Sequence, residues 1–313
     1  MQQHDSDMLK WAAIHGCMDT LKEALQYGAD INTTALVYCP AFPDSFKSRC
    51  SEFLWRPLGS ATTDSNLPRK CSLLEKYATP LMIAAAAGYT EFVETLLQHG
   101  ARVNVAGHSG GVTPLMAAAS AGHTRAMEIL LAGGADTTAK QFAGLTALDL
   151  AAQEGHAAAV SLLLQFDGDQ SRIPGDDAFA YAAQAAQRGY IQVVQAFLDA
   201  GADATASYTM YGYEMPLIFF AVDGDQPDIV SLLLELGVDI ECRNDDAETP
   251  LIHSAITKSL KVCEMLHRRG ADVNARDMDC HSSLYWARAR GGTKMAEMLL
   301  KYGAEPEPHP TEY

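Results

Sequence analysis

The stretch TPLMIAAAAGYTEFVETLLQHGARVN, from Thr79 to Asn104, decides the fold. A similar phrase, TPLMAAASAGHTRAMEILLAGGAD, begins at Thr113, and a third, TALDLAAQEGHAAAVSLLLQ, begins at Thr146. The steps between these threonines are 34 and 33 residues. A repeat of that period is typical of a solenoid, in which each unit buries its apolar face only against its neighbours. We therefore expect an all-α array of repeats.

Each phrase predicts two short helices. Thr-Pro begins the inner helix. The Thr hydroxyl accepts hydrogen bonds from the free backbone N–H groups of the first turn, and Pro is tolerated at the first helical position. Small Ala residues follow, which allows neighbouring helices to approach closely. A Gly ends the inner helix in a left-handed turn. The outer helix carries VxxLL, which is core spacing, and Gly-Ala-Asp then leads into an extended finger loop.

These motifs resemble the ankyrin repeat family, and the resemblance covers roughly residues 7–32 and 79–304. It implies an ankyrin-repeat solenoid of about eight helix-turn-helix units, with a long insertion after the first. Residues 1–32 form an N-terminal capping repeat, for which Asp7 is a candidate helix cap. Residues 79–304 form seven repeats, and 305–313 a tail. The eight units begin at Met8, Thr79, Thr113, Thr146, Ala180, Met215, Thr249 and Ser282.

The insertion at residues 33–78 is unlike the repeats. Its first half is rich in aromatic residues, including Phe42, Phe53 and Trp55, and its second half, 59–68, is polar. A long loop inside a repeat array is usually functional or disordered. Two interpretations stay open: the aromatic half packs on the array as a flap, or much of the insertion is mobile.

Composition restricts the classes of partner. The chain has 39 acidic and 23 basic residues and a formal net charge of −16. Such a chain is unsuited to nucleic acid or to an anionic membrane surface, and a cationic or apolar segment of a protein partner is easier to accommodate. Seven cysteines without paired spacing, and a polar N-terminus, indicate a reduced, cytoplasmic protein.

The family resemblance places binding on a concave groove formed by the inner helices and finger loops. The predicted groove residues are apolar in the N-terminal half (Met82, Ala87, Met116) and charged in the middle (Glu154, Arg188, Asp223). Adaptable Met side chains suit a binding surface, although the two methionines are equally suited to packing between helices.

Aromatic residues on fingers are the second group of candidates. Phe142 lies in one finger, and the longer sixth finger holds Tyr208, Tyr211 and Tyr213. Such residues bury a large area at small entropic cost, so we expect them to contact a partner together with Trp55 of the insertion. Stacking on a neighbouring finger is the alternative for the tyrosines.

The resulting hypothesis is a noncatalytic recognition scaffold that holds a protein segment, without a cofactor and without a metal. The alternative is a small-molecule pocket protein or enzyme with cyclase- or isomerase-like acid–base chemistry, closed by the insertion at 33–78. No catalytic motif stands out in the sequence. No set of Cys and His residues has the spacing of metal ligands, and no Gly-rich phosphate-binding loop is present. His123 and His156 follow inner-helix glycines, where the resemblance implies a structural role, and His253 is expected to be satisfied within the core.

Overall fold

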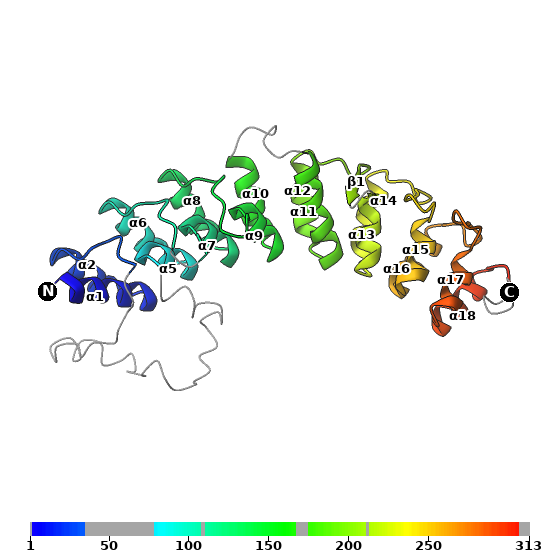
Figure 1. The fold of residues 1–313 in the computed structure, drawn as a ribbon, viewed down its shortest axis with the longest axis horizontal. Coiled ribbons are helices and arrows are strands. Elements are labelled where there is room, and N and C mark those ends of the chain that lie inside the picture. Colours follow the sequence, from blue (N-terminus) through cyan, green and yellow to red (C-terminus); the bar gives the residue numbers. More distant parts are fainter. Residues whose placement is uncertain (1, 35–77, 108–109, 167–174, 211–212, 307–313) are drawn as a thin grey trace. The chain divides into compact units, whose positions relative to one another are not determined.

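The structure is a computed structural model that describes residues 2–34, 78–107, 110–166, 175–210 and 213–306. The chain divides within one helix into two compact units, Met1–Leu162 and Leu163–Tyr313. Each unit is an all-α solenoid of paired inner and outer helices that follow one another along the chain (Figure 1). The predicted fold class is therefore confirmed.

In the first unit the helices alternate between the inner and the outer layer. They are α1 (Gln2–His15), α2 (Met18–Gln26), α5 (Pro80–Ala87), α6 (Thr90–Gln98), α7 (Pro114–Ala121), α8 (Thr124–Ala132) and α9 (Ala147–Gln153). The next helix, α10 (Ala157–Phe166), contains the division between the units.

The second unit repeats this alternation and adds one hairpin. Its elements are α11 (Gly175–Arg188), α12 (Ile191–Asp199), β1 (Ser207–Met210), β2 (Tyr213–Pro216), α13 (Leu217–Asp223), α14 (Pro227–Glu235), α15 (Pro250–Thr257), α16 (Leu260–Arg268), α17 (Ser283–Ala289) and α18 (Thr293–Lys301).

The Thr-Pro and Gly positions act as the sequence predicts. Thr79 Oγ1 accepts from Met82 N at 3.3 Å, and Thr249 Oγ1 accepts from Ile252 N at the same distance. Gly88 and Gly122 close their inner helices with φ of 74°. Leu96 and Leu130 on the outer helices are fully buried, so the predicted core face is correct.

Neighbouring repeats pack together at their left-handed glycines. The residue that follows this position in one repeat lies against the left-handed glycine of the repeat before it. A Cβ on Gly122 would lie 2.6 Å from His156 Nδ1, and a Cβ on Gly88 would lie 2.7 Å from His123 Nδ1. His156 Nε2 also lies 3.2 Å from the carbonyl oxygen of Ser120. The structural role implied for these two histidines is confirmed: each ring fills the space that the absent side chain leaves.

In the second unit, Gln226 lies beside Gly189 in the same way, but the contact between the sixth and seventh repeats has a large left-handed residue and a small partner. Asp225 is the left-handed residue of the sixth repeat, with φ of 51°, and Ser259 takes the place of the histidine in the next repeat. The smaller Ser259 donates to Val222 O at 2.7 Å, and Asp225 Oδ1 accepts from Val262 N at 3.0 Å. A side chain at the left-handed position is therefore accommodated by a small residue in the repeat that follows.

Two inner helices, α1 and α11, are longer than expected. α1 and α11 each have 14 residues, whereas α5, with its Thr cap, has 8. Asp7 lies inside α1 and is not its cap, so that prediction was wrong. Neither helix has a capping Thr or Ser at the repeat position, so each begins further toward the N-terminus, and in the sequence α11 begins directly after Pro174.

The sixth repeat begins one residue later than the sequence alignment predicted. Its inner helix α13 follows Pro216, and the left-handed turn falls at Asp225 instead of Gly224, whose φ is −80°. The preceding finger is a two-stranded antiparallel sheet in which Tyr208 pairs with Met215 and Met210 pairs with Tyr213. This hairpin absorbs the extra residues, and it adds strand to a fold that was expected to contain almost none.

The core lies between the helix layers, where Leu81 and Leu115 are 1% exposed. In the part of the chain that the structure describes, no helix combines the length and the apolar character needed to cross a membrane.

Candidate binding surface

The exposed ends of the inner helices form the surface that we call the inner face. It consists of the last helical residues and their neighbours one turn earlier. In the second unit these are Gln184, Gln187, Arg188, Phe220, Asp223, His253, Thr257, Trp286, Ala289 and Arg290. Phe220 and His253 are buried beneath the others, at 8% and 9% exposure. They come from α11, α13, α15 and α17, which pack against one another in that order.

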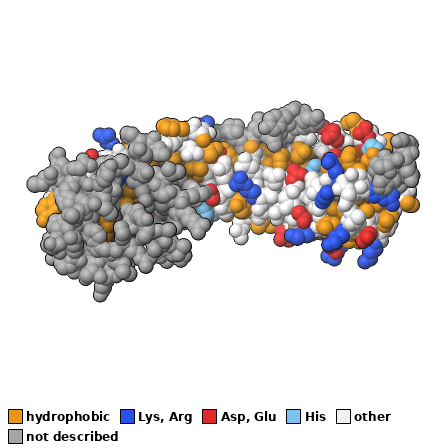
Figure 2. Space-filling model, turned by 60° about the horizontal axis from the view of Figure 1, so that its bottom comes forward, with side chains coloured by type: hydrophobic (Ala, Val, Ile, Leu, Met, Phe, Trp, Pro, Cys, Tyr) orange, Lys and Arg blue, Asp and Glu red, His pale blue; other side chains and the backbone are white. Residues whose placement is uncertain are grey.

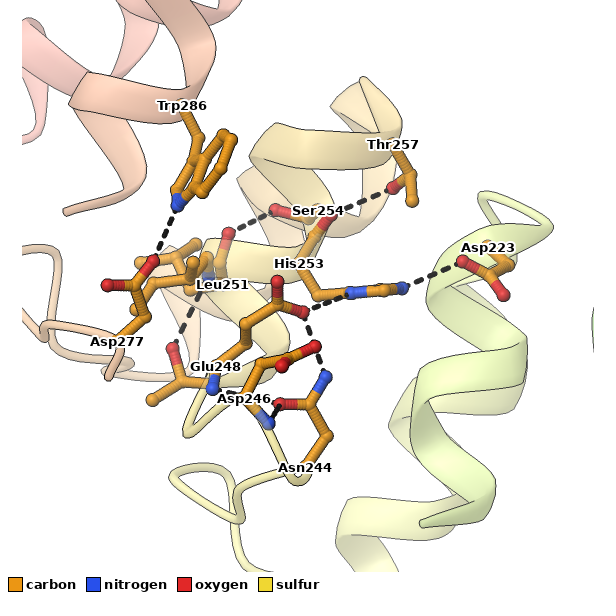
Figure 3. A network of polar contacts seen from close by, with 12 residues as sticks. Asp223, Asn244, Asp246, Glu248, Leu251, His253, Ser254, Thr257, Asp277 and Trp286 are labelled. Carbon is orange, nitrogen blue, oxygen red and sulfur yellow. Dashed lines mark hydrogen bonds and ion pairs between the residues drawn. The ribbon is translucent and has the colours of Figure 1, made fainter. Parts of the chain in front are cut away.

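A histidine held between two carboxylates lies at the centre of this face (Figure 3). His253 Nε2 lies 2.8 Å from Asp223 Oδ1, and His253 Nδ1 lies 2.7 Å from Glu248 Oε2. Asp223 belongs to the sixth repeat, whereas His253 and Glu248 belong to the seventh. The ring of Phe219 packs edge-on against the imidazole at 5.2 Å. The contact therefore joins two repeats through one ring.

The electrostatics favour a protonated imidazole. Burial by itself lowers the pKa of His253, which is 9% exposed, but its hydrogen bonds and charge interactions with Asp223 and Glu248 outweigh burial and raise the pKa to about 9. An imidazolium donates through both ring nitrogens, as these two carboxylates require. The prediction that His253 is satisfied within the fold agrees with this geometry.

The finger before α15 holds Glu248 in place. Asn244 Nδ2 donates to Glu248 Oε2 at 2.8 Å, and Glu248 N donates back to Asn244 Oδ1 at 2.9 Å. The sequence analysis missed both residues. A signal existed, because the residue before the capping threonine is Ala78, Val112 or Leu145 in the earlier repeats and Glu248 here.

A cluster of three rings lies on the eighth repeat, and the sequence analysis missed it as well. Trp286 Nε1 donates to Asp277 Oδ2 at 2.7 Å (Figure 3). Tyr285 stacks on His281 with ring centroids 3.7 Å apart and meets Trp286 edge-on at 5.6 Å. The Arg290 guanidinium carbon lies 5.7 Å from the Trp286 ring centroid. An aromatic platform with a cation over its indole ring results.

The predicted site residues of the first unit divide into buried and exposed. Met82 and Met116 are 1% exposed and pack between helices, which was the alternative reading of the two methionines, so their side chains are not at the surface. Ala87 is half-buried, and Glu154 is exposed at the end of α9. Phe142 is 81% exposed, and its ring lies beside Gly111 of the preceding finger.

In the second unit, Arg188 and Asp223 both lie on the inner face. Arg188 is exposed at the end of α11, and the Asp223 side chain is 27% exposed beside His253. The backbones of Tyr208 and Tyr213 lie in β1 and β2. Tyr211 and Trp55 lie outside the described residues, as do the predictions made for residues 38–55 and 59–68.

Metal binding has no candidate in the described part of the chain. No group of three or more His, Cys, Asp or Glu side chains is arranged there to hold a metal ion.

Comparison with known proteins gives a consistent result. Residues 52–141, 182–277 and 217–309 match the family described as Ankyrin repeats (3 copies), and residues 143–171 match the family described as Ankyrin repeat. Among solved structures, the crystal structure of the human ASB11 ankyrin repeat domain is similar, with a TM-score of 0.59 and 25% sequence identity. The similarity covers 73% of this chain and 100% of that chain. No curated protein matches significantly.

Proposed function

The chain belongs to the ankyrin repeat family, and from this premise we propose that it is a noncatalytic recognition scaffold whose second unit binds a protein segment on its inner face. Ankyrin repeats are typically protein-interaction scaffolds. The proposal for this chain concerns the surface used and the residues that contact the partner.

One observation carries the proposal. The inner helices α11, α13 and α17 present charged or aromatic side chains near their C-terminal ends, namely Arg188, Asp223, Trp286 and Arg290. The frame beneath them is fixed, because the imidazolium of His253 joins the sixth repeat to the seventh. Arg and Trp are enriched among the residues that dominate binding energy, and a rigid support lowers the entropy lost on association.

The prediction of a cationic or apolar partner rests on the charge of the whole chain. At the centre of the inner face, His253 offsets part of the charge of Asp223 and Glu248. The preference for a cationic segment is therefore weaker here than the formal net charge of −16 suggests.

The enzyme alternative gains nothing from His253. Both of its ring nitrogens contact carboxylates, and a general base needs a nitrogen that is free to take a proton from substrate. Scaffold binding requires no such group, so the recognition function is the simpler account of this surface.

The test uses two matched substitutions on neighbouring helices. Gln187 lies on the inner face of α11, Gln192 lies on the outer helix α12, and both are exposed. The full chain serves as bait in native extract, and the captured protein is then titrated calorimetrically against each variant. We expect Gln187→Arg to weaken binding by about tenfold or more, because a bulky charge blocks the inner face, and Gln192→Arg to change little.

The opposite pattern rejects the proposal. If Gln192→Arg abolishes binding while Gln187→Arg has no effect, the partner occupies the outer helices.

A further inference from the structure

We propose that Trp286 and Arg290 form an anchor for an acidic segment of a partner protein, in which a carboxylate binds the guanidinium and an apolar neighbour packs on the rings. The inference rests on the scaffold function and names the class of segment that this part of the inner face takes. It starts from how rigidly the indole is held.

The Asp277 carboxylate holds the indole of Trp286 in place through a hydrogen bond. Its side chain is only 5% exposed. Oδ2 accepts from Trp286 Nε1 at 2.7 Å, while Oδ1 accepts from the backbone N–H groups of His281 at 2.8 Å and Asp279 at 3.0 Å. Both carboxylate oxygens of Asp277 therefore accept hydrogen bonds from residues of this repeat and its finger loop. Trp286 is half-buried, so part of the ring remains accessible.

Arg290 differs from the other arginines of these repeats. Arg243 donates to Ala247 O at 2.6 Å and to Arg276 O at 2.8 Å, and Arg276 donates to Cys280 O at 2.9 Å. Arg268 pairs with Glu264. These guanidinium groups have acceptors.

Arg290 is exposed, and its recorded contact among the described residues is the face of Trp286. A guanidinium within about 6 Å of an indole ring is attracted to it, while its N–H donors stay available for a carboxylate. A bidentate contact with a carboxylate is therefore open to Arg290 beside the indole.

The local charge has the sign that the anchor requires. Residues 258–301 contain nine Lys and Arg and five Asp and Glu, a formal excess of four positive charges in a chain whose net charge is −16. On the face drawn in Figure 2, blue Lys and Arg side chains and red Asp and Glu side chains are interspersed over the half that contains the C-terminal repeats. Electrostatic complementarity favours an acidic segment on this surface.

A short acidic protein segment fits better than a nucleic acid. The excess of positive charge is local, and the strongly negative remainder of the chain repels a long polyanion. The rings of Tyr285 and Trp286 also offer an apolar surface beside the cation, which suits a carboxylate next to a Leu or Phe side chain.

The experiment measures fluorescence anisotropy of labelled probes with the full chain. The probes are a peptide of repeated Asp-Leu-Glu-Phe, the same peptide with Lys at every acidic position, and a single-stranded DNA oligonucleotide. The variants are Arg290→Gln, Arg290→Lys, Trp286→Leu and the control Arg268→Gln, which removes one exposed positive charge from the same repeats. Thermal unfolding of each variant checks that the fold is retained.

We expect the acidic peptide to bind the wild type, and Arg290→Gln to weaken that binding by about tenfold. Arg290→Lys should keep the charge but lose the planar contact, and should weaken binding by about threefold or more. Trp286→Leu should weaken binding, whereas Arg268→Gln should not.

Four results overturn the anchor. These are no saturation by the acidic peptide at about 1 mM, equal or tighter binding of the Lys peptide, an equal loss in Arg268→Gln, and preferential binding of the oligonucleotide. The scaffold function is judged separately. A captured partner that is sensitive to Gln187→Arg but insensitive to Arg290→Gln rejects the anchor and keeps the scaffold. A partner sensitive only to Gln192→Arg rejects the scaffold.

Discussion

Replacing His253 by Gln tests whether the imidazolium holds the sixth and seventh repeats together. Gln has a similar size and one N–H₂ donor group, so it satisfies at most one of the two carboxylates well. The substitution leaves Asp223 and Glu248 facing a neutral side chain in a half-buried site. Removing one partner of a buried ionic contact destabilises a fold more strongly than removing an exposed one.

The magnitude follows from the pKa of His253. That pKa is raised from 6.5 to about 9, and each pKa unit corresponds to about 1.4 kcal/mol. The protonated form therefore contributes about 3 kcal/mol to the free energy of unfolding. Because the folded pKa lies above the unfolded value, this contribution is fully present below pH 6.5. It is lost as the pH rises through about 9.

Urea denaturation, followed by circular dichroism at several pH values, provides the assay. At pH 6.5 we expect His253→Gln to lower the free energy of unfolding by about 3 kcal/mol, and the difference from wild type to shrink as the pH rises above 6.5 and to be mostly lost by about pH 9. The control is His99→Gln, because His99 is exposed on the outer layer. A difference that stays constant across this pH range, or one matched by His99→Gln, would show that the charge on His253 does not stabilise the fold.

Other predictions concern the repeats and the insertion. Leu96→Ala should lower the free energy of unfolding by about 2–5 kcal/mol, because Leu96 is fully buried, and an unchanged denaturation midpoint would contradict the assigned core. Gly122→Ala should cost about 2 kcal/mol through its left-handed φ and the overlap with His156, and a double variant with His156→Ser should be less unstable than the sum of the two single changes. Cys280→Gly should stabilise the protein by about 1 kcal/mol, measured by thermal unfolding, because Cys280 has φ of 62°. If residues 38–55 dock as a flap, Trp55 should be shielded from a collisional quencher and protease should cut first within 59–68; rapid cleavage throughout 38–55 would reject the flap.

The architecture could be read from the sequence because its signals are local. Thr79 caps a helix through a residue three positions away, and Gly88 ends that helix through its own backbone conformation. Each signal acts within one turn and recurs at the repeat period, so the sequence determined the helix pairs, their core faces and the family. Where the signal was absent, as before α1 and α11, the helix boundaries were predicted wrongly.

The surface chemistry depended on contacts between repeats, which spacing along the chain does not encode. Asp223 and His253 are 30 residues apart in the sequence, and their side chains lie within 2.8 Å of each other where α13 packs against α15. The sequence alone predicted Asp223 as a charged residue of the groove, and the tertiary structure showed its partner His253. Trp286 likewise became a candidate anchor only when Asp277 and Arg290 were seen around it. Repeat period fixes which helices neighbour one another, whereas the side chains that meet between them are decided by packing in three dimensions.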